Sequence, residues 1–139
     1  MKKHSCPSSI PDLPNSIVFG VVEGTVTAPR VTYLSEPQPA TAKLLAQSHP
    51  VAPTEVFRFA ASCIERGCQH FQESKCQLAR RIVDRLPEVT VNLPPCSLRQ
   101  HCRWWAEEGK AVCLRCPQIV RTNYSVYGTI EQVIKPQNH

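Results

Sequence analysis

The residues in this chain best suited to chemistry are its cysteines. The chain has 139 residues and 8 cysteines, seven of which lie between Cys63 and Cys116. The segment ends in Cys113-Leu-Arg-Cys116-Pro117. Two thiolates separated by two residues can chelate one metal ion or two corners of a cluster, because the turn between them aims both sulfurs inward. The C-x-x-C-P sequence therefore predicts a metal site.

The remaining cysteine spacings favour iron over zinc. They read Cys-x4-Cys-x7-Cys from Cys63 to Cys76, and Cys-x5-Cys-x10-Cys from Cys96 to Cys113. Zinc fingers and ribbons prefer two short C-x2–4-C pairs, and only Cys113 and Cys116 form a pair with the shortest, two-residue spacing. Irregular spacing is typical of iron–sulfur proteins whose ligands come from separate loops. We therefore expect an iron–sulfur cluster of the [4Fe–4S] type, with zinc as the alternative cofactor.

The candidate ligands outnumber those that one cluster needs. A [4Fe–4S] cluster takes four thiolates, and two clusters would need eight ligands. We expect one cluster with spare structural thiols. Cys63 and Cys102 are predicted to lie within helices, where a buried structural thiol is an alternative to a metal ligand. Cys6 is isolated in a predicted tail, where we expect a free thiol. The candidate metal ligands are Cys63, Cys68, Cys76, Cys96, Cys102, Cys113 and Cys116, and all of these except Cys63 are the preferred cluster ligands.

The segment also resembles a known class of metal-binding domain. Cys68-Gln-His70-Phe71, followed by Cys76 and a later Cys-x5-Cys pair, is similar to the small bacterial zinc- or iron-chelating cysteine-cluster domains. The resemblance covers residues 63–116. It implies metal binding and no particular activity.

The N-terminus and the overall charge bear on location and partners. Prolines at positions 7, 11 and 14 interrupt the region where a signal peptide needs continuous hydrophobicity, and Ile17–Val22 is too short to span a bilayer. We expect a cytoplasmic protein without a membrane partner, in which a dense set of thiols binds metal in preference to forming disulfides. The net charge of +5 suits an acidic partner protein or nucleic acid.

The elements expected to position the cysteines divide the chain in two. Residues 1–53 read as a proline-rich arm that docks a partner protein, with a tail over residues 1–16 and a short hairpin of Ile17–Val22 and Thr25–Thr27. Residues 54–139 read as the cysteine-cluster domain. We expect a small α+β, mainly helical fold organised around the metal site. Its predicted elements are helices over residues 54–67, 75–86 and 97–109, followed by strands over 119–134.

The charged and aromatic residues near the cysteines leave two interpretations. Arginines beside an anionic cluster balance its charge, which we favour, or they form a nucleic-acid surface on which Trp104 stacks with bases. In the predicted helix Trp105 faces the core. The arginines concerned are Arg99, Arg103, Arg115 and Arg121.

The leading function from the sequence is electron transfer or redox sensing with a partner protein. No catalytic motif accompanies the cysteines, so we expect a non-enzymatic protein, with the question of catalysis left open. A structural zinc adaptor and a redox-responsive nucleic-acid-binding regulator are the alternatives.

Overall fold

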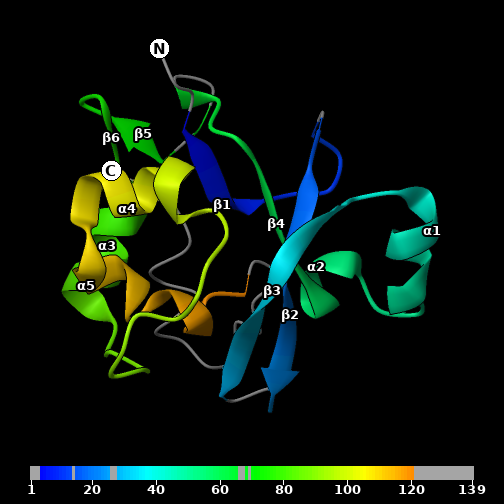
Figure 1. Cartoon of the computed structure of the whole chain (residues 1–139). Coiled ribbons are helices and arrows are strands. Elements are labelled where there is room, and N and C mark those ends of the chain that lie inside the picture. Colours follow the sequence, from blue (N-terminus) through cyan, green and yellow to red (C-terminus); the bar gives the residue numbers. More distant parts are fainter. Residues whose placement is uncertain (1–3, 14, 26–27, 66–67, 69, 121–139) are drawn as a thin grey trace.

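A four-stranded antiparallel sheet forms the centre of the computed structural model, which describes residues 4–13, 15–25, 28–65, 68 and 70–120. Its strands lie in the spatial order β1-β4-β2-β3 (Figure 1). They are β1 (Ser5–Ser9), β2 (Ile17–Gly24), β3 (Pro29–Pro39) and β4 (Phe57–Ser62).

A hairpin begins at Ile17 as predicted, but its second strand is β3 from Pro29, and the predicted second strand Thr25–Thr27 lies partly outside the described residues. β2 pairs with β3 from Ile17 opposite Pro39 to Gly24 opposite Pro29. Gly24 has φ of 86°, and a Cβ atom there would lie 2.6 Å from the carbonyl oxygen of Ala28. Glycine suits this turn because it accepts positive φ without steric cost.

The first predicted helix is wrong. Only Pro53–Val56 is helical (α2), and the chain then continues as strand β4. Five consecutive residues of β4, from Phe57 onward, are buried, because β4 lies between β1 and β2 and is covered on both faces. A continuous buried run has no alternation, so periodicity alone cannot distinguish such a strand from a helix.

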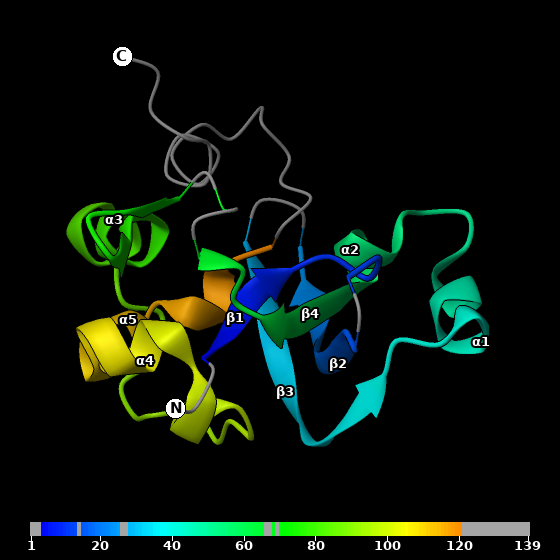
Figure 2. The same cartoon turned by 90° about the horizontal axis from the view of Figure 1, so that it is seen from above.

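Helical segments cover both faces of the sheet (Figure 2). On one face, Val18 and Phe59 pack against Leu44 and Leu45 of helix α1 (Ala42–Leu45) and against α2. On the other face, Phe19 and Ala60 pack against Leu98. Adjacent strand residues point to opposite faces, so Val18 and Phe19 join different cores.

A third core holds the helices of the cysteine-rich half together. Leu78 and Ile82 of α3 (Gln77–Arg85) pack with Trp104 of α4 (Arg103–Glu108) and Val112 of α5 (Lys110–Cys113). The prediction of α3 is confirmed, and the third predicted helix is realised in part by α4. The remaining short elements are η1 (Ala46–Ser48), β5 (Phe71–Gln72), β6 (Lys75–Cys76), η3 (Arg99–His101) and η4 (Cys116–Gln118).

The expectation of a mainly helical fold organised around a metal site is wrong. The fold is mixed α+β, and its centre is the antiparallel sheet with apolar cores on both faces. Within the described residues, no three His, Cys, Asp or Glu side chains are arranged so that they could hold one metal ion. Buried Val, Phe and Ala side chains form the cores on the two faces of the sheet, so the seven clustered cysteines do not organise the fold.

Strands from both sides of residue 53 belong to the same sheet. β4 pairs with β1 and with β2, so residues 1–53 and the segment after them share one set of hydrogen bonds. The predicted tail over residues 1–16 contains β1. The terminal strands predicted over 119–134 lie outside the described residues from position 121 onward. None of the described helices is both long and apolar enough to cross a membrane.

Candidate functional site

The structure sorts the cysteines into two groups of four. Cys6, Cys63, Cys68 and Cys76, here called the first group, line one cavity of about 270 Å³. Cys96, Cys102, Cys113 and Cys116, the second group, line a neighbouring space of about 20 Å³. Trp104 lines both. All eight are free thiols.

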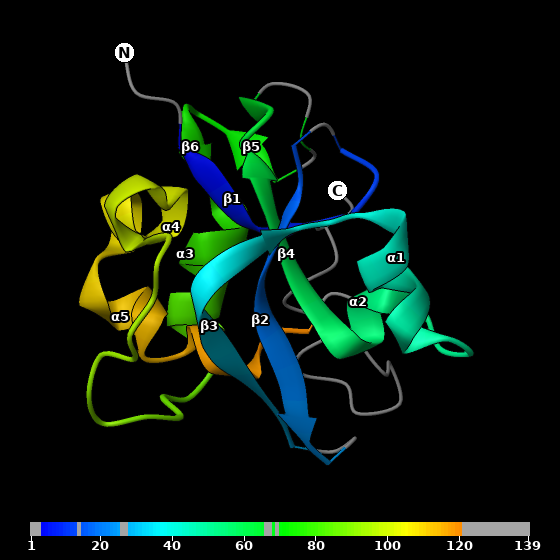
Figure 3. The same ribbon diagram turned by 45° about the vertical axis from the view of Figure 1, so that its right-hand side comes forward.

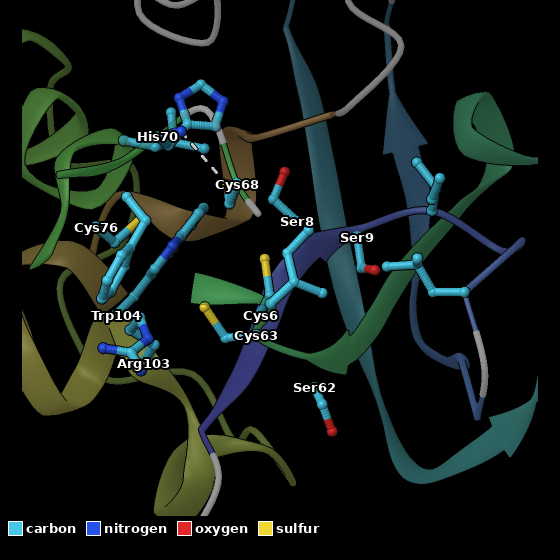
Figure 4. A pocket seen from close by; sticks show the side chains of 15 residues that line it. Cys6, Ser8, Ser9, Ser62, Cys63, Cys68, His70, Cys76, Arg103 and Trp104 are labelled. Atoms are coloured by element: carbon cyan, nitrogen blue, oxygen red, sulfur yellow. Dashed lines mark hydrogen bonds between the residues drawn. The ribbon is translucent and has the colours of Figure 1, made fainter. Parts of the chain in front are cut away.

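Four separate segments bring the first group together, as Figure 4 shows. Cys6 lies in β1, opposite Ala61 of β4. Cys63 directly follows β4, and its backbone N–H donates to the carbonyl oxygen of His4 at 2.8 Å. Cys68 precedes β5, and Cys76 ends β6 and caps the N-terminus of α3. Cys63 is therefore not on a helix, and the expected competition with a helical core position does not arise.

Cys6 is the site residue that sequence reasoning missed. We predicted a free thiol in a tail, yet the antiparallel pairing of β1 with β4 places Cys6 near Cys63, although 56 residues separate them in the sequence. Spacing cannot reveal such a contact. The one available indication was the total of 8 cysteines, which is two complete sets of four.

The second group comes from the segment that packs against the other side of β1. Cys96 lies before η3, Cys102 caps α4, Cys113 ends α5 and Cys116 begins η4. Ser5 of β1 forms a bridge with Cys102. The next two residues of β1 then face different spaces, because Cys6 lines the first cavity and Pro7 lines the second. Strand β1 thus runs between the groups, beside α4 (Figure 3).

Backbone amides point at the sulfur atoms in a repeated local geometry. The N–H of His70 donates to the Cys68 sulfur at 3.4 Å. The same relation, from an amide two residues after the cysteine, occurs at four more positions. These pairs are Ser8 to Cys6, Leu78 to Cys76, Leu98 to Cys96 and Trp104 to Cys102, and at Cys76 and Cys102 the amides of Ala79 and Trp105, three residues on, contribute more. Such N–H···S contacts favour the thiolate and tune metal–sulfur centres.

Burial keeps five of the thiols protonated when they are free, namely those of Cys6, Cys76, Cys96, Cys102 and Cys113. It raises the pKa of Cys6 to about 12, against a lowering contribution from the Ser8 amide. It also raises the pKa of Cys102 to about 12, and it raises the pKa values of Cys76, Cys96 and Cys113. Buried neutral thiols are poor nucleophiles. Metal binding displaces the protons and replaces them with a positive charge, so these groups are better suited to ligation than to catalysis.

Carboxylates balance the arginine at the first group. Arg103 is buried, and its guanidinium pairs with Glu65 at 2.5 Å and with Glu107 at 2.9 Å. The second oxygen of Glu107 accepts from the backbone N–H of Cys76 at 2.8 Å. This carboxylate therefore joins α4 to the start of α3 beside a candidate ligand.

The second group faces arginines that have no carboxylate partner in the described part of the chain. Arg58 of β4 is 4% exposed and lies between the rings of Phe19 and Trp104, 5.2 Å and 5.3 Å from their centroids. Burial alone would lower the pKa of Arg58, but the neighbouring Cys116 thiol and Tyr33 hydroxyl raise it. Arg99 lies over Trp105 and hydrogen-bonds Cys113.

Several other sequence-based expectations are revised. Trp104 is 1% exposed and belongs to a core, whereas Trp105 is half-buried, which reverses the predicted orientation of the pair. The helix begins at Arg103 instead of Ser97, so the helical phase assumed for the pair was wrong. Arg115 bonds the carbonyl oxygen of Leu86 at 2.8 Å. Arg121 lies outside the described residues.

We predict that Glu107→Ala lowers the free energy of unfolding by about 2 kcal/mol. Losing one partner of a fully buried ion pair costs roughly 3–5 kcal/mol. The effect is smaller here because Arg103 retains Glu65 and the Glu107 side chain is 13% exposed. Urea unfolding measures the change.

The neighbouring Glu108 is the matched control for this prediction. It pairs with Arg80, whose side chain is 52% exposed, and exposed ion pairs contribute little because water screens them. An equal loss from Glu107→Ala and Glu108→Ala would contradict the structural role given to Glu107.

Comparison with known proteins identifies no relative, because no protein-family model, curated protein or solved structure matches this chain. The resemblance to cysteine-cluster domains therefore stays a prediction.

Proposed function

We propose that the first cysteine group holds an iron–sulfur cluster of the [4Fe–4S] type, and that the protein transfers or senses electrons together with a partner protein. The observation that carries the proposal is the convergence of Cys6, Cys63, Cys68 and Cys76 on one cavity. Four thiolates are the complete ligand set of such a cluster.

The size of the cavity favours a cluster over a single ion. Thiolates bound to one zinc ion lie about 3.8 Å apart, given a Zn–S distance of about 2.3 Å and tetrahedral geometry. One water-sized body needs roughly 10–15 Å³ of free space, whereas the cavity that these thiols line together with eleven other residues measures about 270 Å³. A polynuclear cluster needs ligands distributed around a volume, and this is the arrangement that the first group has.

The surroundings of the cavity suit the charge of a cluster. Amides at Ser8, His70 and Leu78 direct hydrogen bonds at three of the sulfurs. Arg103 and the buried His70 line the same cavity. Hydrogen bonds to sulfur affect the reduction potential of iron–sulfur centres.

Electron exchange requires a partner. A one-electron carrier protein would lose one electron as the centre gains one, and no bond to the cysteines would form or break. Residues 1–53 are the segment that we propose for docking, and they also supply Cys6. The exposed Ile64 lies at the cavity and offers an apolar contact beside the site.

The test is metal analysis of the full chain purified without oxygen. We expect brown protein with iron and acid-labile sulfide, and visible absorbance that dithionite bleaches. Cys76→Ser should remove the iron of this centre. Ser9→Ala is the control, because Ser9 lines the same cavity without offering a thiol. Colourless protein with zinc at the first group, or full iron content in Cys76→Ser, would overturn the proposal.

A further inference from the structure

The second cysteine group combines ligands with buried positive charge that has no counterpart. The Nη2 atom of Arg58 and the Nε atom of Arg99 are buried and have no hydrogen-bond partner among the described residues. The other nitrogens of Arg58 donate to the carbonyl oxygens of Pro7 at 2.8 Å and Cys116 at 2.7 Å. These neutral acceptors fix the guanidinium but do not cancel its charge.

Burial makes an unpaired guanidinium charge energetically unfavourable, because the charge loses its hydration. The buried charge of Arg58 loses much of its solvation in the protein interior, and the two flanking rings recover only part of that loss. Proteins normally pair a buried arginine with a carboxylate, as Arg103 is paired at the first group. Beside Arg58 the structure instead places thiols, of which Cys116 and Cys102 interact with it most favourably.

A bound metal would supply the missing negative charge. Four thiolates around one divalent ion carry a net charge of about −2, which matches two guanidiniums. We propose that Cys96, Cys102, Cys113 and Cys116 hold a second metal–thiolate centre, for which Arg58 and Arg99 are the counter-cations. The proposal concerns a site separate from the first group, although counting its metal as additional to the iron of that group rests on the proposed function.

The space between the second-group thiols restricts how the metal enters. It measures about 20 Å³, which accommodates about one water-sized body. One ion enters if the cysteine side chains rotate toward it, and a cluster enters only if they move apart. Acid-labile sulfide distinguishes these outcomes, because a cluster contains sulfide and a single ion does not.

The test compares metal content in matched variants of the full chain. The wild type should contain metal beyond the roughly four irons of one [4Fe–4S] cluster. Cys113→Ser should remove the metal of the second group and leave the iron of the first group. Cys76→Ser should remove the iron of the first group and leave the metal of the second. Extra zinc without sulfide identifies a single ion, and about four further irons with sulfide identify a cluster.

Arginine variants test the counter-cation assignment. Arg58→Met and Arg99→Met should each weaken retention of the second metal against a chelator by roughly 10- to 100-fold, the range for groups that support metal ligands. Arg58→Lys should restore much of it. The iron of the first group reports whether each variant folds. If Arg58→Met does not fold, Arg99→Met still tests the counter-cation assignment.

The two proposals fail in different ways. Metal content that Cys113→Ser leaves unchanged, while Cys76→Ser abolishes it, overturns the second centre and keeps the first. Wild-type protein without iron but with metal sensitive to Cys113→Ser overturns the iron–sulfur function and keeps the second centre. Retention unaffected by Arg58→Met and Arg99→Met rejects the counter-cation role.

Discussion

Cys6→Ser is expected to remove the iron of the first group, about four atoms per chain, and to leave the fold in place. Serine keeps the size of the side chain but replaces a soft thiolate with a hard oxygen that binds iron poorly. The three remaining cysteines would leave one corner of the cluster open. Cys6 lies in β1 and lines the cavity with Cys63, Cys68 and Cys76.

Iron and sulfide analysis of anaerobically purified protein measures this loss. Ser5→Ala is the matched control, because Ser5 belongs to the same strand but does not line the cavity. Full iron content in Cys6→Ser would show that Cys6 is a spare thiol, as its sequence position alone suggested. Circular dichroism establishes that the strand is retained.

Trp104→Ala is expected to lower the free energy of unfolding by about 3–5 kcal/mol, the range for a fully buried aromatic side chain. Trp104 is 1% exposed and is the largest fully buried side chain of the described structure. Its ring packs with α3 and α5, lines both cysteine cavities and lies 5.3 Å from the Arg58 guanidinium. The substitution therefore removes core packing and one of the two rings that stabilise a buried cation.

Trp105→Ala is the control for this prediction. Trp105 is half-buried and lies against Arg99, so its loss should cost less than half as much. Urea unfolding of both variants measures the difference. A larger loss from Trp105→Ala would reverse the assignment and support the orientation predicted from helical periodicity.

Elements that depend on local chemistry were predictable. Strand β2 and the glycine at its end, with φ of 86°, follow from an apolar run and a turn residue, although the returning strand begins at Pro29 instead of Thr25. Helix α3 follows from Leu78 and Ile82 on one face and Pro87 after its end. Neighbouring residues determine both elements, so the sequence contains the information needed.

Elements that depend on distant contacts were not predictable. β4 was taken for a helix because its burial comes from β1 and β2 on either side and from helices on both faces. The direction of Trp104 depended on the residue at which α4 begins, which is Arg103, directly after Cys102 in extended backbone. A shift of a few residues in a helix start rotates every later side chain.

The sequence by itself determined that this chain carries a dense set of thiols and that Cys113 and Cys116 are close enough to act together. Only the tertiary structure decided that the 8 cysteines form two groups of four, with Cys6 completing the first. The physical reason is that antiparallel pairing of β1 with β4 joins residues more than fifty positions apart. The hydrogen bonds and buried apolar side chains of the sheet determine that pairing. It cannot be inferred from the spacing of the cysteines.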